Sequence, residues 1–248
     1  MQTSEVSKNT LGAGPALALT ALAYCALSVG VNLLHELLSA QLQHPQGVGQ
    51  RVALTLSMSM LLLWSMFATV RLVLRARGQT FADIGWRRSA PLRGWAAATL
   101  LLVLYAGLML AGPLRSAPYL SDWSAFRIST ALGAGLSAGI CEETLFRGFV
   151  MTQSRDAGMP VAVQILLSAL LFGLAHVGWG RLTGHVSVAA LVGSVGSTFV
   201  LGILFAAVYL LSRRGLMAVA VARAGIDCLI EPWLILNALG GGFAHPGQ

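Results

Sequence analysis

Acidic, basic and imidazole side chains occur in this chain inside stretches that are otherwise apolar. A carboxylate and an imidazole that meet at one place can hold and deprotonate a water molecule. A guanidinium nearby can donate hydrogen bonds to an oxyanion. Together they suggest hydrolysis of an acyl bond, most naturally a peptide bond. The residues concerned are Glu142, Glu143, Arg147, His176, Arg223 and Asp227.

Helical spacing sorts these residues into pairs. Glu143 and Arg147 are four residues apart, as are Arg223 and Asp227, so each pair can meet on one face of a helix. Either pair, taken alone, is explained by structure at least as well as by catalysis. Glu142 points about 100° away from Glu143 around the helix, so Arg147 cannot readily serve both carboxylates. We therefore expect Glu142 to have no partner on its own helix.

The composition predicts a membrane protein. Of the 248 residues, 56% are hydrophobic and 10% are charged, whereas a soluble domain carries about 25% charged residues. A span needs roughly 20 residues, and lipid accepts only helices and closed barrels. The sequence shows no barrel-like alternation. We predict an all-α, polytopic membrane helix bundle of about seven transmembrane helices, with an eighth span or a re-entrant segment as alternatives. The seven segments lie around 15–38, 52–74, 94–113, 129–152, 160–178, 188–211 and 215–238.

The possible catalytic groups converge on one depth. A helix rises about 1.5 Å per residue, which places Glu142, His176, Arg223 and Asp227 roughly 12 to 24 Å from the membrane face. They come from three predicted helices. Because ionisable groups are costly in a bilayer, their convergence favours a shared polar intramembrane cavity.

Basic residues predict the orientation of the bundle. Cytoplasmic loops are enriched in Lys and Arg, which places the N-terminus in the cytoplasm. Because the chain is rich in Arg and poor in Lys, we expect it to come from a bacterial inner membrane. We expect it to contact the lipid bilayer and to bind no nucleic acid. Ten basic residues fall on one side (Lys8, Arg71, Arg75, Arg77, Arg87, Arg88, Arg93, Arg155, Arg213, Arg214) and four on the other (Arg51, Arg115, Arg127, Arg181).

Three short motifs resemble a known family. EETLFR matches EExxxR, FGLAH matches FxxxH, and Arg223 to Asp227 stands where the family has HxxxN or HxxxD. Their order and spacing resemble the CAAX protease and bacteriocin-processing family (CPBP, also called ABI), which includes the type II CAAX prenyl endopeptidases. The resemblance begins near FADIGWRR. We expect N-terminal membrane helices and an Arg-rich loop over 1–79, a protease core over 80–240 and a tail over 241–248.

The resemblance implies a role for each motif residue. Glu142 and His176 would activate the attacking water, and Arg223 with Asp227 would stabilise the oxyanion. The supporting residues would be Glu143, Arg147 and Phe172. The substrate would be a membrane-associated or lipidated protein or peptide, and the sequence does not specify an oligomeric state.

One residue departs from the family pattern. Arg223 replaces the histidine of the third motif, and a guanidinium cannot ligate zinc. Glu142, His176 and at most Asp227 remain, a poor set for a catalytic zinc with three protein ligands. We therefore expect a glutamate-dependent mechanism with no metal or cofactor. His185, the possible substitute histidine, falls in a predicted loop on the far side.

Other functions are compatible with the same residues. A catalytically silent scaffold or immunity protein would keep the fold without cleavage. A transporter would use Glu142, Asp227 and Glu231 as proton relays, but the chain lacks the matched half-helices of inverted-repeat transporters. A metalloprotease would lose activity on chelation.

Three separated cysteines, Cys25, Cys141 and Cys228, are expected to be small apolar residues rather than disulfide partners or nucleophiles.

Overall fold

The computed structural model describes residues 11–41, 48–87, 90–112, 125–182 and 188–240. Seven long helical segments account for most of them, and no strand occurs among the described residues, so the predicted all-α fold is confirmed. The segments are α1 (Ala13–Gln41), α2 (Val48–Ala76), α3 (Leu92–Ala111), a continuous run formed by α4 (Ala125–Thr130), η1 (Ala131–Gly135), α5 (Leu136–Glu143), η2 (Thr144–Val150) and α6 (Met151–Asp156), then α7 (Val161–Leu182), α8 (Val188–Leu211) and α9 (Leu216–Gly240).

Two π-helical turns interrupt the run from α4 to α6. The second, η2, begins directly after Glu143 and contains Arg147. Within it, the Phe146 carbonyl accepts a hydrogen bond of 2.9 Å from the Ser168 hydroxyl of α7. Turns of this kind often occur at functional sites. The apolar pattern of the sequence predicts a helix here but does not indicate the wider turns.

The outer surface of the bundle suits a lipid environment. Within the described part of the chain, four helical stretches are long and apolar enough to cross a membrane: Ala13–Ala40, Ala53–Ala76, Leu92–Ala111 and Leu191–Leu211. Large apolar side chains face outward, such as Leu22 of α1 at 69% exposure and Leu108 of α3 at 67%. The run from α4 to α6 and α9 carry the motif acids and arginines instead. The chain is therefore a helical membrane bundle with its ionisable groups inside.

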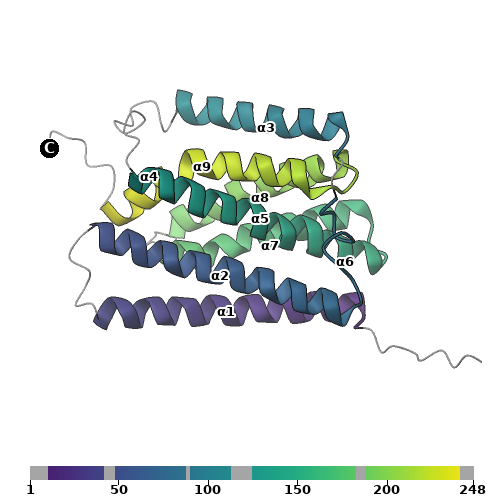
Figure 1. The fold of residues 1–248 in the computed structure, drawn as a ribbon, viewed down its shortest axis with the longest axis horizontal. Coiled ribbons are helices and arrows are strands. Elements are labelled where there is room, and N and C mark those ends of the chain that lie inside the picture. Colours follow the sequence, from purple (N-terminus) through teal and green to yellow (C-terminus); the bar gives the residue numbers. More distant parts are fainter. Residues whose placement is uncertain (1–10, 42–47, 88–89, 113–124, 183–187, 241–248) are drawn as a thin grey trace, which may run out of the picture.

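The helix that carries the two motif glutamates lies in the middle of the bundle. Figure 1 shows α5 between α2 and α9, with α1 beyond α2 and α3 beyond α9. Helices α7 and α8 pack against each other behind this layer. The residues of α5 are therefore surrounded by helices from both ends of the chain.

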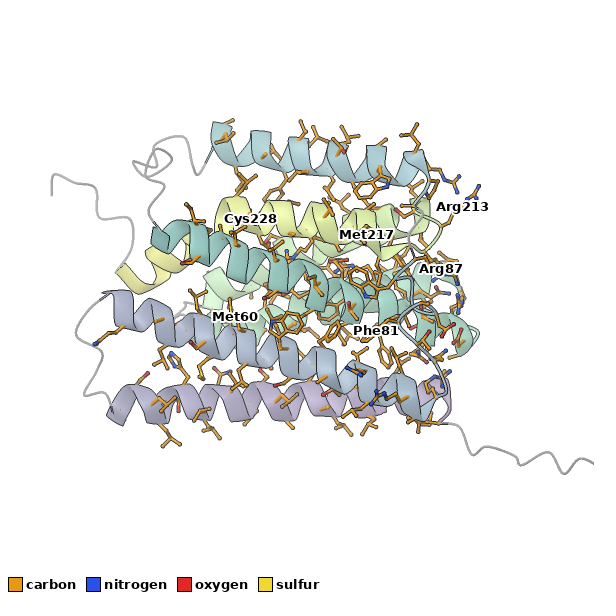
Figure 2. The ribbon with its side chains drawn as sticks, in the orientation of Figure 1. Met60, Phe81, Arg87, Arg213, Met217 and Cys228 are labelled. Carbon is orange, nitrogen blue, oxygen red and sulfur yellow. The ribbon has the colours of Figure 1, made fainter. Side chains whose placement is uncertain are left out.

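Arginine-rich segments gather at one end of the bundle. Arg87 and Arg213 lie at that end in Figure 2. The Arg93 Nε donates to the Leu211 carbonyl (3.1 Å), and the Leu216 N–H donates to the Gly85 carbonyl (2.9 Å). The prediction that these two loops share one side is confirmed, and the side of the membrane that they face stays a prediction.

Small residues let the central helices approach closely. A Cβ added at Gly139 of α5 would lie 2.7 Å from the Ala220 carbonyl oxygen of α9. One added at Gly202 of α8 would lie 3.0 Å from the Ala169 Cα of α7. Gly202 thus allows α8 to pack closely on α7. Because Gly139 is one turn before Glu142, the same approach brings that carboxylate to α9.

Candidate active site

Glu142 meets the third motif through an ion pair between helices. The Arg223 Nη2 lies 2.7 Å from the Glu142 Oε2, and the Arg223 Nε lies 3.0 Å from the Asp227 Oδ2. The side chains are 5% exposed for Arg223 and Asp227 and 16% for Glu142. The Arg223–Asp227 pair follows the predicted spacing. As expected, Glu142 pairs with no cation of its own helix, and its cationic partner belongs to α9.

Glu143 and Arg147 form a second, fully buried pair. The Arg147 Nη1 donates to the Glu143 Oε1 at 2.9 Å, and neither side chain has exposed surface. The Arg147 Nη2 donates to the Gly202 carbonyl of α8 at 3.0 Å. Glycine at this position avoids a clash with Ala169 and Phe172 of α7. The predicted pairing is confirmed, and its geometry ties the glutamate motif to α8.

Two phenylalanine rings lie against both guanidinium groups. The Phe172 ring centroid is 4.5 Å from the Arg147 Cζ and 5.1 Å from the Arg223 Cζ. The Phe205 centroid is 5.1 Å and 5.8 Å from the same two atoms. Aromatic faces attract cations, most strongly where water is excluded. Phe172, the first residue of FxxxH, therefore stabilises two buried cations. The sequence analysis did not single out Phe205, because no motif includes it.

His176 has one nitrogen committed to its own helix. Its Nδ1 lies 2.8 Å from the Phe172 carbonyl oxygen. Because a carbonyl oxygen only accepts, this bond assigns a proton to Nδ1. In the neutral imidazole, Nε2 is then an acceptor. The ring also packs edge to face on Phe172, at 4.9 Å between centroids, which limits its orientation.

Glu142 and His176 line one small cavity. Its volume is about 70 Å³, and Cys141 and Tyr24 are also on its wall. Liquid water occupies about 30 Å³ per molecule, so the space suits water beside two polar groups. The structure thus brings together the carboxylate and the imidazole that the motifs placed on different helices. Tyr24, from α1, was missed because a lone tyrosine in an apolar helix carries no catalytic signal.

The side chains around this cavity are a poor metal site. Among the residues that the structure describes, no three His, Cys, Asp or Glu side chains are placed to hold a metal ion. Arg223 brings a positive charge to within 2.7 Å of Glu142, where a cation would have to bind. His185 and the side chain of Glu231 lie outside the described part of the chain. The cysteines are reduced, and Cys228 donates to the Ala131 carbonyl (3.1 Å).

Comparison with known families agrees with this geometry. Residues 123–229 match the family described as type II CAAX prenyl endopeptidase, Rce1-like. This segment is therefore similar to Rce1-like CAAX protease domains. Comparisons with curated proteins and with solved structures give no match. The matched segment contains all six ionisable motif residues and Phe172, whereas Tyr24 lies outside it, on α1.

Proposed function

We propose that the protein is an intramembrane, glutamate-dependent endopeptidase that cleaves a membrane-associated or lipidated protein or peptide. One observation carries the proposal: Glu142 and His176 line the same cavity within the segment that matches the CAAX protease family. The cavity holds water-sized space between a general base and an imidazole acceptor. That is the arrangement that hydrolysis by an activated water requires.

In the proposed reaction, Glu142 takes a proton from a water molecule that also donates to the Nε2 of His176. The water oxygen forms a bond to the peptide carbonyl carbon, and the carbonyl oxygen becomes an oxyanion. The C–N bond then breaks, and the proton held by Glu142 passes to the leaving nitrogen. His176 holds the water in line throughout because its Nδ1–H is bonded to the Phe172 carbonyl.

Arg223 would stabilise the oxyanion. A guanidinium carries five N–H donors in a planar fork, so one group can serve two carboxylates and an oxyanion. Asp227, 3.0 Å from the Arg223 Nε, would set the orientation of the fork. The rings of Phe172 and Phe205 exclude water from it, and donors in such a dry site act more strongly.

We further propose that no metal takes part. Support comes from the donor set: Arg223 stands where a third ligand would be needed, and its charge opposes a bound cation beside Glu142.

The arginine-rich end is proposed to face the cytoplasm of a bacterial inner membrane, supported by the bias of ten basic residues against four. Reporter fusions at the Arg87 loop test this orientation.

The decisive experiment compares membrane-protein termini in cells that express the wild type or Glu142→Gln, by mass spectrometry of new N- and C-termini. We expect a set of termini that vanishes in Glu142→Gln and persists in Glu36→Gln, a matched change at an exposed glutamate of α1. Identical termini in all three strains, with equal amounts of folded protein, would refute proteolysis.

A catalytically silent scaffold is the second candidate, and the Glu142–Arg223 ion pair is the observation that favours it. A carboxylate held by a guanidinium at 2.7 Å would be less available to bind a water molecule. This candidate predicts that Arg223→His, which restores the family histidine, creates cleavage that the wild type lacks. The proposed peptidase instead predicts that wild-type protein cleaves.

A further inference from the structure

A second cavity lies beside the one that holds Glu142 and His176. This α1–α7 cavity is lined almost wholly by apolar side chains of α1, η2 and α7. It shares four wall residues with the catalytic cavity: Tyr24, Leu145, Phe146 and Ala175. The two spaces are therefore neighbours with a common wall.

The two cavities differ greatly in size. The catalytic cavity measures about 70 Å³ and the α1–α7 cavity about 410 Å³. Sites that bury a small organic molecule usually measure about 300–1,000 Å³. The catalytic cavity therefore has space for water but not for a substrate, whereas the α1–α7 cavity has substrate-sized space.

Tyr24 is the polar part of the common wall. Its hydroxyl reaches from α1 to α7 and donates to the Ala175 carbonyl at 3.1 Å. Ala175 directly precedes His176. The tyrosine is half-buried, and its ring borders both spaces. Of the four shared wall residues, Tyr24 alone comes from α1, and turning its side chain away would cost one hydrogen bond to α7.

Small residues of α1 keep the α1–α7 cavity open to the outside of the bundle. Ala18, Ala21 and Cys25 line it and are exposed. Their spacing of three and four residues puts them on one helix face. On the opposite side, Leu174 of α7 also lines it and is 49% exposed. An apolar group already in the bilayer can therefore reach Tyr24 laterally.

We infer that Tyr24 is a specificity-determining residue: its ring sets how far an apolar group of the substrate, held in the α1–α7 cavity, extends toward Glu142 and His176. This inference rests on the proposed peptidase function. It assigns a role to α1, which lies outside the segment that matches the CAAX protease family. A smaller residue at this position would join the cavities and admit larger groups beside the scissile bond.

A photolabelling experiment tests the wall without requiring activity. Purified full-length protein in liposomes is exposed to a neutral hexapeptide that carries one diazirine-bearing leucine, and labelled residues are located by mass spectrometry. In the wild type we expect labels on 17–25, 167–175 and the shared wall residues Leu145 and Phe146, and few on the Glu142 segment, 138–142. Tyr24→Ala should raise labelling of the Glu142 segment several-fold, and Tyr24→Phe, which keeps the ring, should raise it less.

The control is Leu22→Ala, on the outward face of the same helix, and it should leave the labelling pattern unchanged. Equal labelling of the Glu142 segment in wild type and Tyr24→Ala would overturn the inference. The inference would also be overturned if a diazirine phospholipid, but not the peptide, labelled the α1–α7 cavity, because a bilayer lipid would then be the occupant. Ala21→Leu, which fills the cavity, should abolish the peptide labels there.

Activity provides the second readout once a cleaved substrate is known. Tyr24→Ala should change the ratio of kcat/KM between substrates with large and small apolar groups by about tenfold, in favour of the large. An unchanged ratio in an active enzyme would overturn the inference and leave the peptidase function intact. A wild type with no cleavage would refute the proposed function, while the labelling result would still decide whether Tyr24 separates the cavities.

Discussion

The same substitution at two adjacent glutamates should mainly lower stability at one and mainly lower catalysis at the other. Glu142→Gln and Glu143→Gln are equal in chemistry and differ only in surroundings. Glu143 has no exposed surface and neutralises the equally buried Arg147 at 2.9 Å. Glu142 is 16% exposed, and its partner Arg223 also pairs with Asp227. We therefore expect Glu143→Gln to affect stability most and Glu142→Gln to affect catalysis most.

The magnitudes follow from burial. Removing one partner of a buried ion pair leaves an uncompensated charge and costs about 3–5 kcal/mol. The Glu143 substitution should therefore lower the free energy of unfolding by about that amount. Glu142→Gln should lower it by at most about 1.5–3 kcal/mol, the value of a hydrogen bond to a charged group. Loss of the general base should lower kcat about 100- to 10,000-fold.

Unfolding in mixed micelles with increasing SDS measures the first quantity, and cleavage of an identified substrate by folded protein measures the second. Glu36→Gln, at an exposed site on α1, should change neither. The reasoning would be refuted if Glu142→Gln destabilised the protein more than Glu143→Gln, or if folded Glu142→Gln kept wild-type kcat.

Three further perturbations test the surroundings of the site. Phe172→Leu removes a ring that contacts two guanidinium groups and should destabilise the protein by about 2 kcal/mol or more, while Phe67→Leu, which touches neither, should cost less in the same unfolding assay. Gly139→Ala places a Cβ 2.7 Å from the Ala220 carbonyl oxygen and should cost about 1–3 kcal/mol, with loss of cleavage. Gly107→Ala, which meets nothing within 4 Å, should be neutral or stabilising in that assay. Cleavage rates measured after exhaustive chelation should equal those before it, and a loss restored by zinc would contradict the metal-free proposal.

The helices themselves could be predicted because each apolar stretch must satisfy its own backbone hydrogen bonds in lipid. The predicted segment 94–113 corresponds to α3 (Leu92–Ala111), and 215–238 corresponds to α9 (Leu216–Gly240). The pairs Glu143–Arg147 and Arg223–Asp227 could also be predicted, because the two residues of each pair lie four apart on the same helix. The resemblance of EETLFR and FGLAH to the family motifs EExxxR and FxxxH marked Glu142 and His176.

Contacts between helices depended on the tertiary structure. The Arg223–Glu142 ion pair joins α9 to α5, and nothing in either segment specifies that the two helices touch at these residues. The π-helical turn η2 after Glu143 contacts α7, where the Ser168 hydroxyl donates to the Phe146 carbonyl, and no pattern in the sequence marks this turn. Phe205 could not be predicted from the sequence, because its ring contacts two guanidinium groups that other helices carry.

By itself the sequence determined the membrane setting, the number of long helices, the ionisable residues and the pairs within single helices, because hydropathy and local spacing act along one helix. Only the tertiary structure decided that Glu142 and His176 share a cavity, that Arg223 pairs with Glu142, and that Tyr24 lines both this cavity and a larger apolar one. The physical reason is that helix packing depends on complementary surfaces from distant parts of the chain. A close contact such as Gly139 against α9 can be measured only after the helices have met.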